Sequence, residues 1–250
     1  MSPTSYLFVF ESEPGVSTPR PGQFVNVAVS DELTLRRPFA VAGLPSPGRY
    51  ELLVEVRGHG TRALTEKPIG SAVEVAGPLG NEFAMPEEGE VSVLVAGGFG
   101  VAGLRLLAQE LRRGYHRVHA LVGARNSTGL LHHMLPAPTG DGEMLIEVAT
   151  DDGSEGFHGP VTGLLEKVLS EAGRPARVYC CGPPVMVAAA AEVTRTAGAP
   201  CQALLEEMMA CGVGACRGCV VKTRDGYRTV CKDGPVFDTE ELVLEELVRA

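Results

Sequence analysis

The sequence predicts a multi-domain protein of the β plus α/β class: an antiparallel barrel, a doubly wound parallel-sheet domain and a small C-terminal cysteine module. Three observations predict this fold. Short apolar runs separated by Pro, Gly and Asp fill residues 24–77, and apolar strands alternate with helical patterns from residue 91. Four of the seven cysteines lie between residues 211 and 231. The expected domains are residues 1–88, 89–199 and 200–250.

The first domain is expected to be a small antiparallel barrel, because its apolar runs are short and punctuated by turn residues. The expected strands are 24–29, 38–43, 50–56 and 71–77. The acidic stretch MPEEGE at 85–90 is the predicted linker to the next domain.

Two stretches of the barrel suit a phosphate-bearing ligand. Arg36 and Arg37 place two cations beside a strand, and guanidinium groups match phosphate geometry. The turn GHGT at 58–61 precedes a predicted helix start, whose N–H groups attract anions. Each stretch by itself is more typical of a surface turn than of a cofactor site.

From residue 91 the pattern alternates between strand and helix, which is typical of a doubly wound parallel sheet. The expected strands are 91–97, 117–124, 143–150 and 176–182. The expected helices are 101–114, 160–173 and 183–198, with a short one near 127–135.

A glycine-rich turn, AGGFGVAG at 96–103, follows the first of these strands and opens a helix. Glycines there let a phosphate approach the backbone, although tight strand–helix packing needs glycine too. The acidic residue of the dinucleotide fingerprint is missing, and Arg125 lies in that region. Two later strand ends, TDDGSEG at 150–156 and CGPP at 181–184, are expected at the same sheet edge, which favours dinucleotide binding. The candidate residues are Gly97, Gly98, Gly100, Cys181, Gly182 and Pro183.

The cysteine spacing Cys211-x4-Cys216-x2-Cys219-x11-Cys231 is the plant-type arrangement for a [2Fe–2S] cluster. Gly and Ala between the thiols allow backbone N–H groups to approach the cluster sulfurs. The alternative is free or zinc-bound thiols, but structural zinc usually takes two Cys-x2-Cys pairs and only one is present. A hairpin around 225–226 and a helix over 238–250 are expected to complete the module. Cys180, Cys181 and Cys201 lie outside the pattern and receive no role.

Composition excludes several classes of function. A net charge of −9 argues against nucleic acid and anionic membranes as partners. The longest apolar stretch, 91–104, is too short to span a bilayer. The N-terminus lacks a basic region and meets Glu11 early, so we expect no signal peptide. The expected location is cytoplasmic, with reduced cysteines rather than a disulfide framework.

Six motifs occur in one order along the chain: RRPFA, GHGT, AGGFGVAGL, TDDGS, CGPPVM and LEEMMACGVGACRGC. Together with CKDGPVF at 231–237, they resemble the iron–sulfur flavoprotein subunits of type B dihydroorotate dehydrogenases, a branch of the ferredoxin reductase-like family. The resemblance covers essentially the whole chain. It implies an FAD-binding β-barrel, an NAD-binding α/β domain and a [2Fe–2S] module.

The resemblance also assigns residues. The family's flavin motif falls on Arg37, Pro38, Phe39 and Ala40, the strand above the flavin ring on Leu53, Val54 and Glu55, and the pyrophosphate turn on Gly60 and Thr61. The cluster ligands fall on Cys211, Cys216, Cys219 and Cys231. Ala40 stands where the family usually has serine, so a shifted flavin potential or slower hydride transfer is expected. Gly103 stands where a proline is common.

The implied function is an electron relay. Electrons from the FMN of a dihydroorotate-oxidising catalytic subunit would pass through the cluster and FAD to NAD⁺, the acceptor substrate, in pyrimidine synthesis. The implied assembly is a heterotetramer with two copies of each subunit, and no catalytic acid or base is expected in this chain. The alternatives are a related FAD/[2Fe–2S] reductase subunit serving sulfide or ferredoxin:NAD(P)⁺ oxidoreduction, a zinc- and nucleotide-binding regulator, and a self-sufficient reductase.

Overall fold

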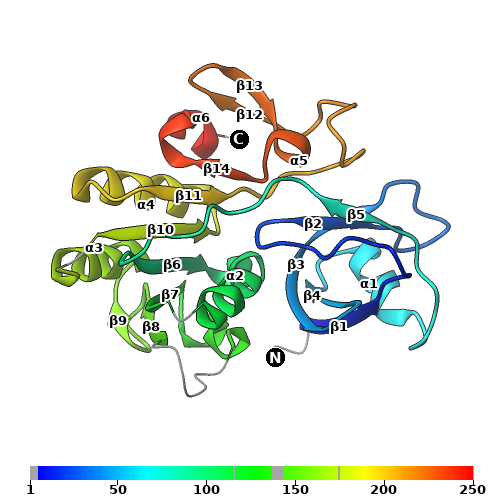
Figure 1. The fold of residues 1–250 in the computed structure, drawn as a ribbon, viewed down its shortest axis with the longest axis horizontal. Coiled ribbons are helices and arrows are strands. Elements are labelled where there is room, and N and C mark those ends of the chain that lie inside the picture. The colour runs from blue at the N-terminus through cyan, green and yellow to red at the C-terminus, as the bar shows by residue number, and fades with distance from the viewer. Residues whose placement is uncertain (1–4, 115, 137–143, 174, 250) are drawn as a thin grey trace.

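The computed structural model describes residues 5–114, 116–136, 144–173 and 175–249. Its first part is a five-stranded antiparallel sheet of order β1-β4-β3-β2-β5, which wraps around one core with helix α1 beside it (Figure 1). The elements are β1 (Ser5–Glu11), β2 (Phe24–Val27), β3 (Arg37–Ser46), β4 (Arg49–Glu55), α1 (His59–Glu66) and β5 (Val75–Leu79). We call residues 5–88 the barrel domain.

The strand β1 was not predicted from the sequence. It pairs along its whole length with β4, from Ser5 opposite Glu55 to Glu11 opposite Arg49. As the edge strand it is buried only in part, although residues 6–10 form an apolar run that is itself a strand signal.

The second part is a seven-stranded sheet of order β14-β11-β10-β6-β7-β8-β9, parallel except for β14. The predicted doubly wound parallel sheet is therefore confirmed. Its strands are β6 (Val91–Gly97), β7 (Val118–Ala124), β8 (Met144–Thr150), β9 (Phe157–His158), β10 (Ala176–Cys181), β11 (Cys201–Leu204) and β14 (Val236–Asp238). Its helices are α2 (Val101–Arg113), α3 (Val161–Glu171) and α4 (Pro184–Ala197), and the 3-10 turns are η1 (Gly98–Gly100), η2 (Ser127–Gly129) and η3 (His132–Met134). Glu143, expected to begin a strand, lies outside the described residues.

Strand β6 explains why helices cover both faces of this sheet. All seven of its residues are buried, and successive side chains of a strand point to opposite faces. Val93 and Val95 pack into a core with residues of α3 and α4, whereas Leu94 and Ala96 pack into another core with residues of α2. A strand buried on both faces is expected to be a nearly continuous apolar run, and Ser92 is the one polar residue of β6.

The C-terminal part comprises β12 (Val220–Thr223), β13 (Gly226–Thr229), α5 (Val230–Asp233), η4 (Thr239–Glu241) and α6 (Leu244–Arg249). The hairpin predicted around residues 225–226 is present. The helix expected over 238–250 is wrong in extent: it begins only at Leu244, and Ala250 lies outside the described residues. A continuous helix from residue 238 is excluded, because Leu242 bridges to Thr223 and the Val243 N–H donates to the Lys222 carbonyl at 3.1 Å.

The sequence predicted that a separate module begins at residue 200. Two strands beyond residue 199 nevertheless belong to the large sheet. β11 pairs in parallel with β10, and β14 pairs antiparallel with β11. The cysteine segment between them therefore leaves and re-enters the same sheet edge, and it lies above β2 and β5 of the barrel domain (Figure 1). No helix in the described ranges has the length and hydrophobicity needed to cross a membrane.

Candidate functional site

A cavity of about 280 Å³ lies where the barrel domain, helix α2 and the segment after β11 meet. Its lining is mainly apolar, and it suits a flat ring system better than a charged ligand. Of the residues that the resemblance assigned to the flavin motif and to the strand above the ring, Pro38 to Ala40 and Leu53 to Glu55 line this cavity, as does Thr61, whereas Arg37 does not. Sequence reasoning missed the other lining residues, which are Gly22, Phe24, Arg57, Phe99, Ala102, Leu204, Leu205, Glu206, Glu207, Met209 and Pro235.

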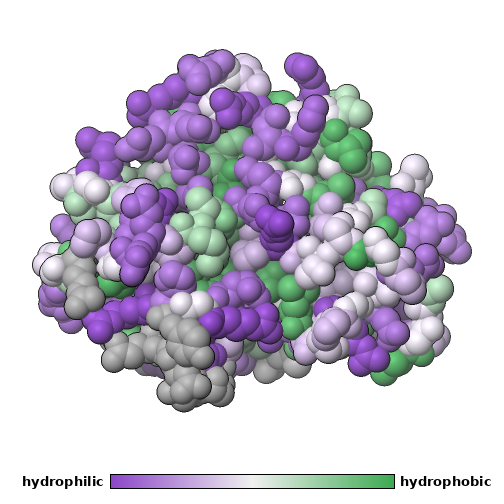
Figure 2. Space-filling model, in the orientation of Figure 1, coloured by the Kyte–Doolittle hydropathy of each residue, from purple (hydrophilic) through white to green (hydrophobic). Residues whose placement is uncertain are grey.

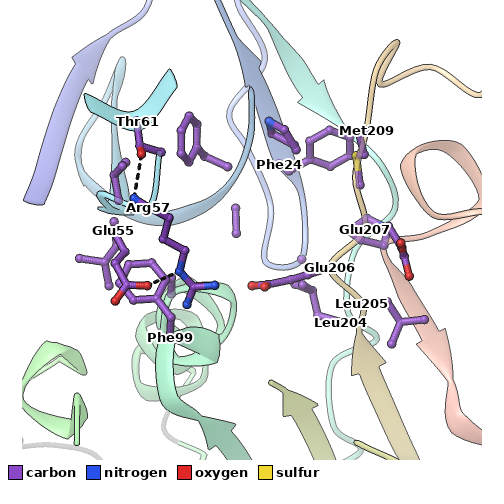
Figure 3. A pocket seen from close by; sticks show the side chains of 18 residues that line it. Phe24, Glu55, Arg57, Thr61, Phe99, Leu204, Leu205, Glu206, Glu207 and Met209 are labelled. Atoms are coloured by element: carbon purple, nitrogen blue, oxygen red, sulfur yellow. Dashed lines mark hydrogen bonds and ion pairs between the residues drawn. The ribbon is translucent and has the colours of Figure 1, made fainter. Parts of the chain in front are cut away.

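Two opposite charges face each other across the cavity. Figure 3 shows the carboxylate of Glu206 pointing toward the guanidinium of Arg57, which also forms an ion pair with Glu55. Burial raises the pKa of Glu206, and the positive charge of Arg57 opposes that rise. Glu206 lies in the LEEMM stretch just before the cysteines, a motif in which no individual residue was predicted to act. On the face that Figure 2 draws, hydrophobic residues lie between the left and right lobes, among hydrophilic ones.

The two candidate phosphate stretches of the barrel meet in space. A Cβ added to Gly60 would lie 2.7 Å from Nε of Arg37, so the guanidinium rests directly on the first turn of α1. The hydroxyl of Thr61 accepts the backbone N–H groups of Arg57 and Gly58 at 3.0 and 3.2 Å, which fixes the turn. Arg36 is turned away and pairs with Glu74 at 2.9 Å. A cation beside the N–H groups at a helix N-terminus is an arrangement that can bind a pyrophosphate.

The two glycine-bearing strand ends of the parallel sheet also pack against each other. A Cβ on Gly100 would lie 2.0 Å from the carbonyl oxygen of Cys181, and one on Gly97 would lie 2.8 Å from Cδ of Pro183. Gly182 has a φ of +158°, and a Cβ added to it would lie 3.0 Å from the backbone N and Cα atoms of Gly97. Gly98, with a φ of +52°, has open space around it. These four glycines let two turns lie against each other at the carboxyl edge of β6 and β10.

The Cys181 side chain does not belong to that edge. It is fully buried, with its sulfur 3.0 Å from where a Cβ on Gly103 would stand, and burial raises its thiol pKa far above the usual value. Cys181 therefore contributes its backbone to the turn and its thiol to the core. Cys180 and Cys201 are likewise buried, with their sulfurs 3.9 Å apart.

The four cysteines of the C-terminal segment are linked by backbone N–H groups that point at sulfur. The Cys211 sulfur accepts from Val213 and Cys216 at 3.4 Å, Gly214 donates to the sulfur of Cys231 at 3.0 Å, and Cys231 donates to that of Cys219 at 3.4 Å. Gly212 and Gly214 have φ values of +74° and +80°, which L side chains rarely adopt. Cys231 lies on α5, a separate element that brings the fourth thiol to the loop.

The thiol pKa values of Cys211 and Cys231 shift in opposite directions. The backbone N–H groups of Cys216 and Val213 lower the pKa of Cys211 to about 6. Burial, with the nearby Cys219, raises the pKa of Cys231 to about 12 despite the N–H of Gly214. A set of four thiols with amide donors at sulfur fits an iron–sulfur cluster, because donors stabilise the sulfur charge. Within the described ranges, no three His, Cys, Asp or Glu side chains converge tightly enough to hold a single metal ion.

The C-terminal segment matches a known family. Residues 206–243 match the family model described as the iron-sulfur cluster binding domain of dihydroorotate dehydrogenase B. A relative from Caldanaerobacter subterraneus, named dihydroorotate dehydrogenase B (NAD(+)), electron transfer subunit, is 37% identical over 90% of this chain and 87% of its own length. A relative of the same name from Shouchella clausii is 36% identical over 96% of this chain and 93% of its own.

Solved structures share the whole architecture. A chain of an NADH-dependent reduced ferredoxin-NADP oxidoreductase, studied for flavin-based electron bifurcation, has a TM-score of 0.83 and 31% identity, covering 98% of this chain and 87% of that chain. A ferredoxin NADP⁺ reductase from Neisseria gonorrhoeae with bound FAD and NADP has a TM-score of 0.62 and 18% identity. The match covers 79% of this chain and 87% of that chain. The second similarity shows the fold alone. Because curated relatives above 30% identity span nearly the full length, the chain belongs to the family of electron transfer subunits of dihydroorotate dehydrogenase B.

Proposed function

We propose that this chain is the electron transfer subunit of an NAD-dependent dihydroorotate dehydrogenase and that it relays electrons between a catalytic subunit and NAD⁺. The observation that carries this proposal is the near full-length similarity to subunits of that name, combined with four thiols placed beside an apolar cavity. When bound, FAD exchanges single electrons with a [2Fe–2S] cluster and a hydride with NAD(H), which is why such a relay contains both groups.

The cavity residues are proposed to hold the FAD ring. Pro38 to Ala40 and Leu53 to Glu55 form one wall, Phe99 and Met209 add apolar contacts, and the lining excludes water from the ring. Arg37, with the N–H groups of Gly60 and Thr61 at the start of α1, is proposed to bind the pyrophosphate.

The second nucleotide is proposed to bind at the carboxyl edge of the parallel sheet. The support is the close packing of two turns, formed by Gly97, Gly98 and Gly100 and by Cys181, Gly182 and Pro183. Phe99 connects this edge to the cavity, because it lies between two of these glycines and lines the cavity wall. A nicotinamide bound at the edge would therefore have a short path to the flavin.

Cys211, Cys216, Cys219 and Cys231 are the proposed cluster ligands, since four thiols with sulfur-directed N–H groups are the donor set that such a cluster needs. Functionally, we divide the chain into residues 1–88 for FAD, 89–199 for NAD and 200–250 for the cluster. Cys216 is exposed, so this end of the site is open to a partner subunit.

The partner is proposed to be the FMN-containing subunit that oxidises dihydroorotate, in a complex with two copies of each chain. Native mass measurement of the purified complex tests that composition.

One experiment tests the whole function. The chain is purified anaerobically with its native partners, and NAD⁺-dependent formation of orotate from dihydroorotate is assayed. We expect orotate and NADH in equal amounts. A stable partner complex that lacks this activity would refute the pyrimidine assignment.

A second function is favoured by the 31% identity to the ferredoxin-NADP oxidoreductase chain. In that case the same cofactors would serve a different partner, and the purified complex would exchange electrons between NAD(P)H and ferredoxin without forming orotate.

A further inference from the structure

Asn26 is a buried polar side chain on the side of the barrel domain that faces the cysteine segment. Side chains of a strand alternate between two faces, and Val25 and Val27 of β2 belong to the barrel core. Phe24 and Asn26 therefore point the other way. Phe24 lines the cavity, and Asn26 is only 1% exposed. One strand thus presents an aromatic ring to the flavin cavity and, two residues later, a carboxamide to the neighbouring loop.

The loop in contact with Asn26 is the one that carries Cys211. A Cβ added to Gly212 would lie 2.9 Å from Nδ2 of Asn26 and 3.3 Å from Cδ1 of Leu79. The loop backbone therefore rests on the nitrogen end of the carboxamide, one residue after the first cysteine. The positive φ of Gly212 and this lack of space both require glycine there.

The oxygen end of the same carboxamide is left without a partner. Oδ1 of Asn26 is buried, and within the described part of the chain no group donates a hydrogen bond to it. Buried polar atoms are nearly always hydrogen-bonded, because burial without a partner costs the free energy of removing the atom from water. An apolar side chain of the same shape would avoid that cost. Asn26 is therefore not the residue that stability alone would favour here, which indicates that its N–H donors have a use.

We propose that Asn26 is a positioning residue for the iron–sulfur cluster: it holds the Cys211–Gly212 turn and directs an N–H group toward the sulfur atoms at that end of the site. This inference rests on the proposed cluster ligands. Hydrogen bonds to cluster sulfurs raise the reduction potential, because they stabilise the charge added on reduction. Phe24 of the same strand lines the flavin cavity, so β2 borders both the cysteine segment and the cavity.

The test is the variant Asn26→Leu in the intact complex, which keeps the number and branching of the side-chain heavy atoms and removes the N–H donors. We expect iron content near that of the wild type, an altered electron paramagnetic resonance spectrum of the reduced cluster, and a tenfold less favourable reduction. That factor corresponds to a shift of about −59 mV for one electron. The flavin potential should not move, and Asn26→His, which restores an N–H donor, should recover most of the shift.

Val25→Ala is the matched control, because it loosens the same strand from its opposite face. It should lower the thermal unfolding midpoint without shifting the cluster potential, whereas Asn26→Leu should shift the potential without lowering the midpoint. If the Asn26→Leu protein contains less iron than the wild type, the proposal requires a wild-type iron content in both Asn26→His and Val25→Ala.

An unchanged cluster potential and spectrum in Asn26→Leu, an equal shift in Val25→Ala, or movement of the flavin potential alone would overturn the proposal. Absence of any cluster signal from the wild type would instead refute the proposed function, so the two failures are distinguishable.

Discussion

Arg105, on the first helix of the parallel-sheet domain, forms a buried ion pair with Glu51 on strand β4 of the barrel domain. The two side chains are only 14% and 12% exposed. The same guanidinium donates to the carbonyl oxygens of Ala42 and Met134 at 2.9 and 2.8 Å. Leu106, the next residue of the helix, is fully buried in the core of the barrel domain. Helix α2 therefore joins the proposed flavin and nucleotide domains.

The variant Arg105→Met should lower the free energy of unfolding by about 3–5 kcal/mol, because it leaves the Glu51 carboxylate buried without a partner. Urea denaturation followed by circular dichroism measures this loss, and the double variant with Glu51→Gln should regain part of it. The control is Arg49→Met, whose ion pair with Glu11 is exposed on both sides and should contribute less than about 1 kcal/mol. Equal losses in the two single variants would contradict the burial of the Arg105 pair.

The variant Gly100→Ala should weaken NADH binding at least tenfold, or by about 1.4 kcal/mol. The added Cβ would lie 2.0 Å from the carbonyl oxygen of Cys181, so the two nucleotide turns must separate. Titration of flavin reduction against NADH concentration measures this, while flavin and cluster absorption should stay unchanged. Gly198→Ala is the control: its φ of +66°, unlike the φ of −56° at Gly100, is unfavourable for alanine, but the added methyl group would have open space around it. A normal NADH affinity in Gly100→Ala would place the nucleotide elsewhere.

The variant Ala40→Ser restores the serine that the family usually has at this position of the proposed flavin site. Ala40 lines the cavity, and a hydroxyl there would add one hydrogen bond of about 1 kcal/mol to the flavin ring. We expect a changed flavin potential and an increase of about fivefold in the rate of flavin reduction by NADH. Stopped-flow kinetics and redox titration measure the two effects. If both values equal those of the wild type, position 40 does not tune the flavin.

The variant Cys216→Ser should abolish the visible absorption of the cluster, because it removes one of the four proposed ligands. Cys201→Ser is the matched control: its thiol is buried near Cys180, outside the cysteine segment. It should keep the iron content and lose at most a little stability. Full iron content in Cys216→Ser would remove this cysteine from the ligand set.

The ion pair between Glu90 and Arg177 should make stability depend on pH. Burial acts to raise the pKa of Glu90, but the hydrogen bond and charge of Arg177 outweigh it and hold this pKa below its ordinary value of 4.5. A carboxylate with a lowered folded-state pKa stabilises the fold above its unfolded-state pKa and loses that contribution as the pH falls. Glu90→Gln should therefore lower the unfolding free energy by about 1 kcal/mol at pH 7.

The difference between Glu90→Gln and the wild type should shrink as the pH falls below about 4.5, which urea denaturation at a series of pH values measures. A difference that stays constant down to pH 3.5 would show that hydrogen-bond geometry, rather than the charge of Glu90, is responsible.

Local patterns predicted much of the fold because their signals are short in range. The continuous apolar run of β6 and the helix closed by Gly114 follow from the chain alone. The strands β1, β11 and β14 were not predicted. Each of these lies at or near a sheet edge, is short or partly exposed, and is defined by its pairing partner rather than by its own residues. The expected terminal helix failed for a related reason, since Leu242 is held by a distant bridge to Thr223.

The sequence by itself determined which chemistry this protein can hold, because the spacing of Cys211, Cys216 and Cys219 and the glycine-rich turn after β6 encode it locally. Only the tertiary structure decided how these parts face one another. Glu206 opposite Arg57, Arg37 on Gly60 and Asn26 beneath Gly212 join residues far apart in the chain. Such contacts depend on how sheets and helices pack, and packing is a property of the whole fold that no local pattern records.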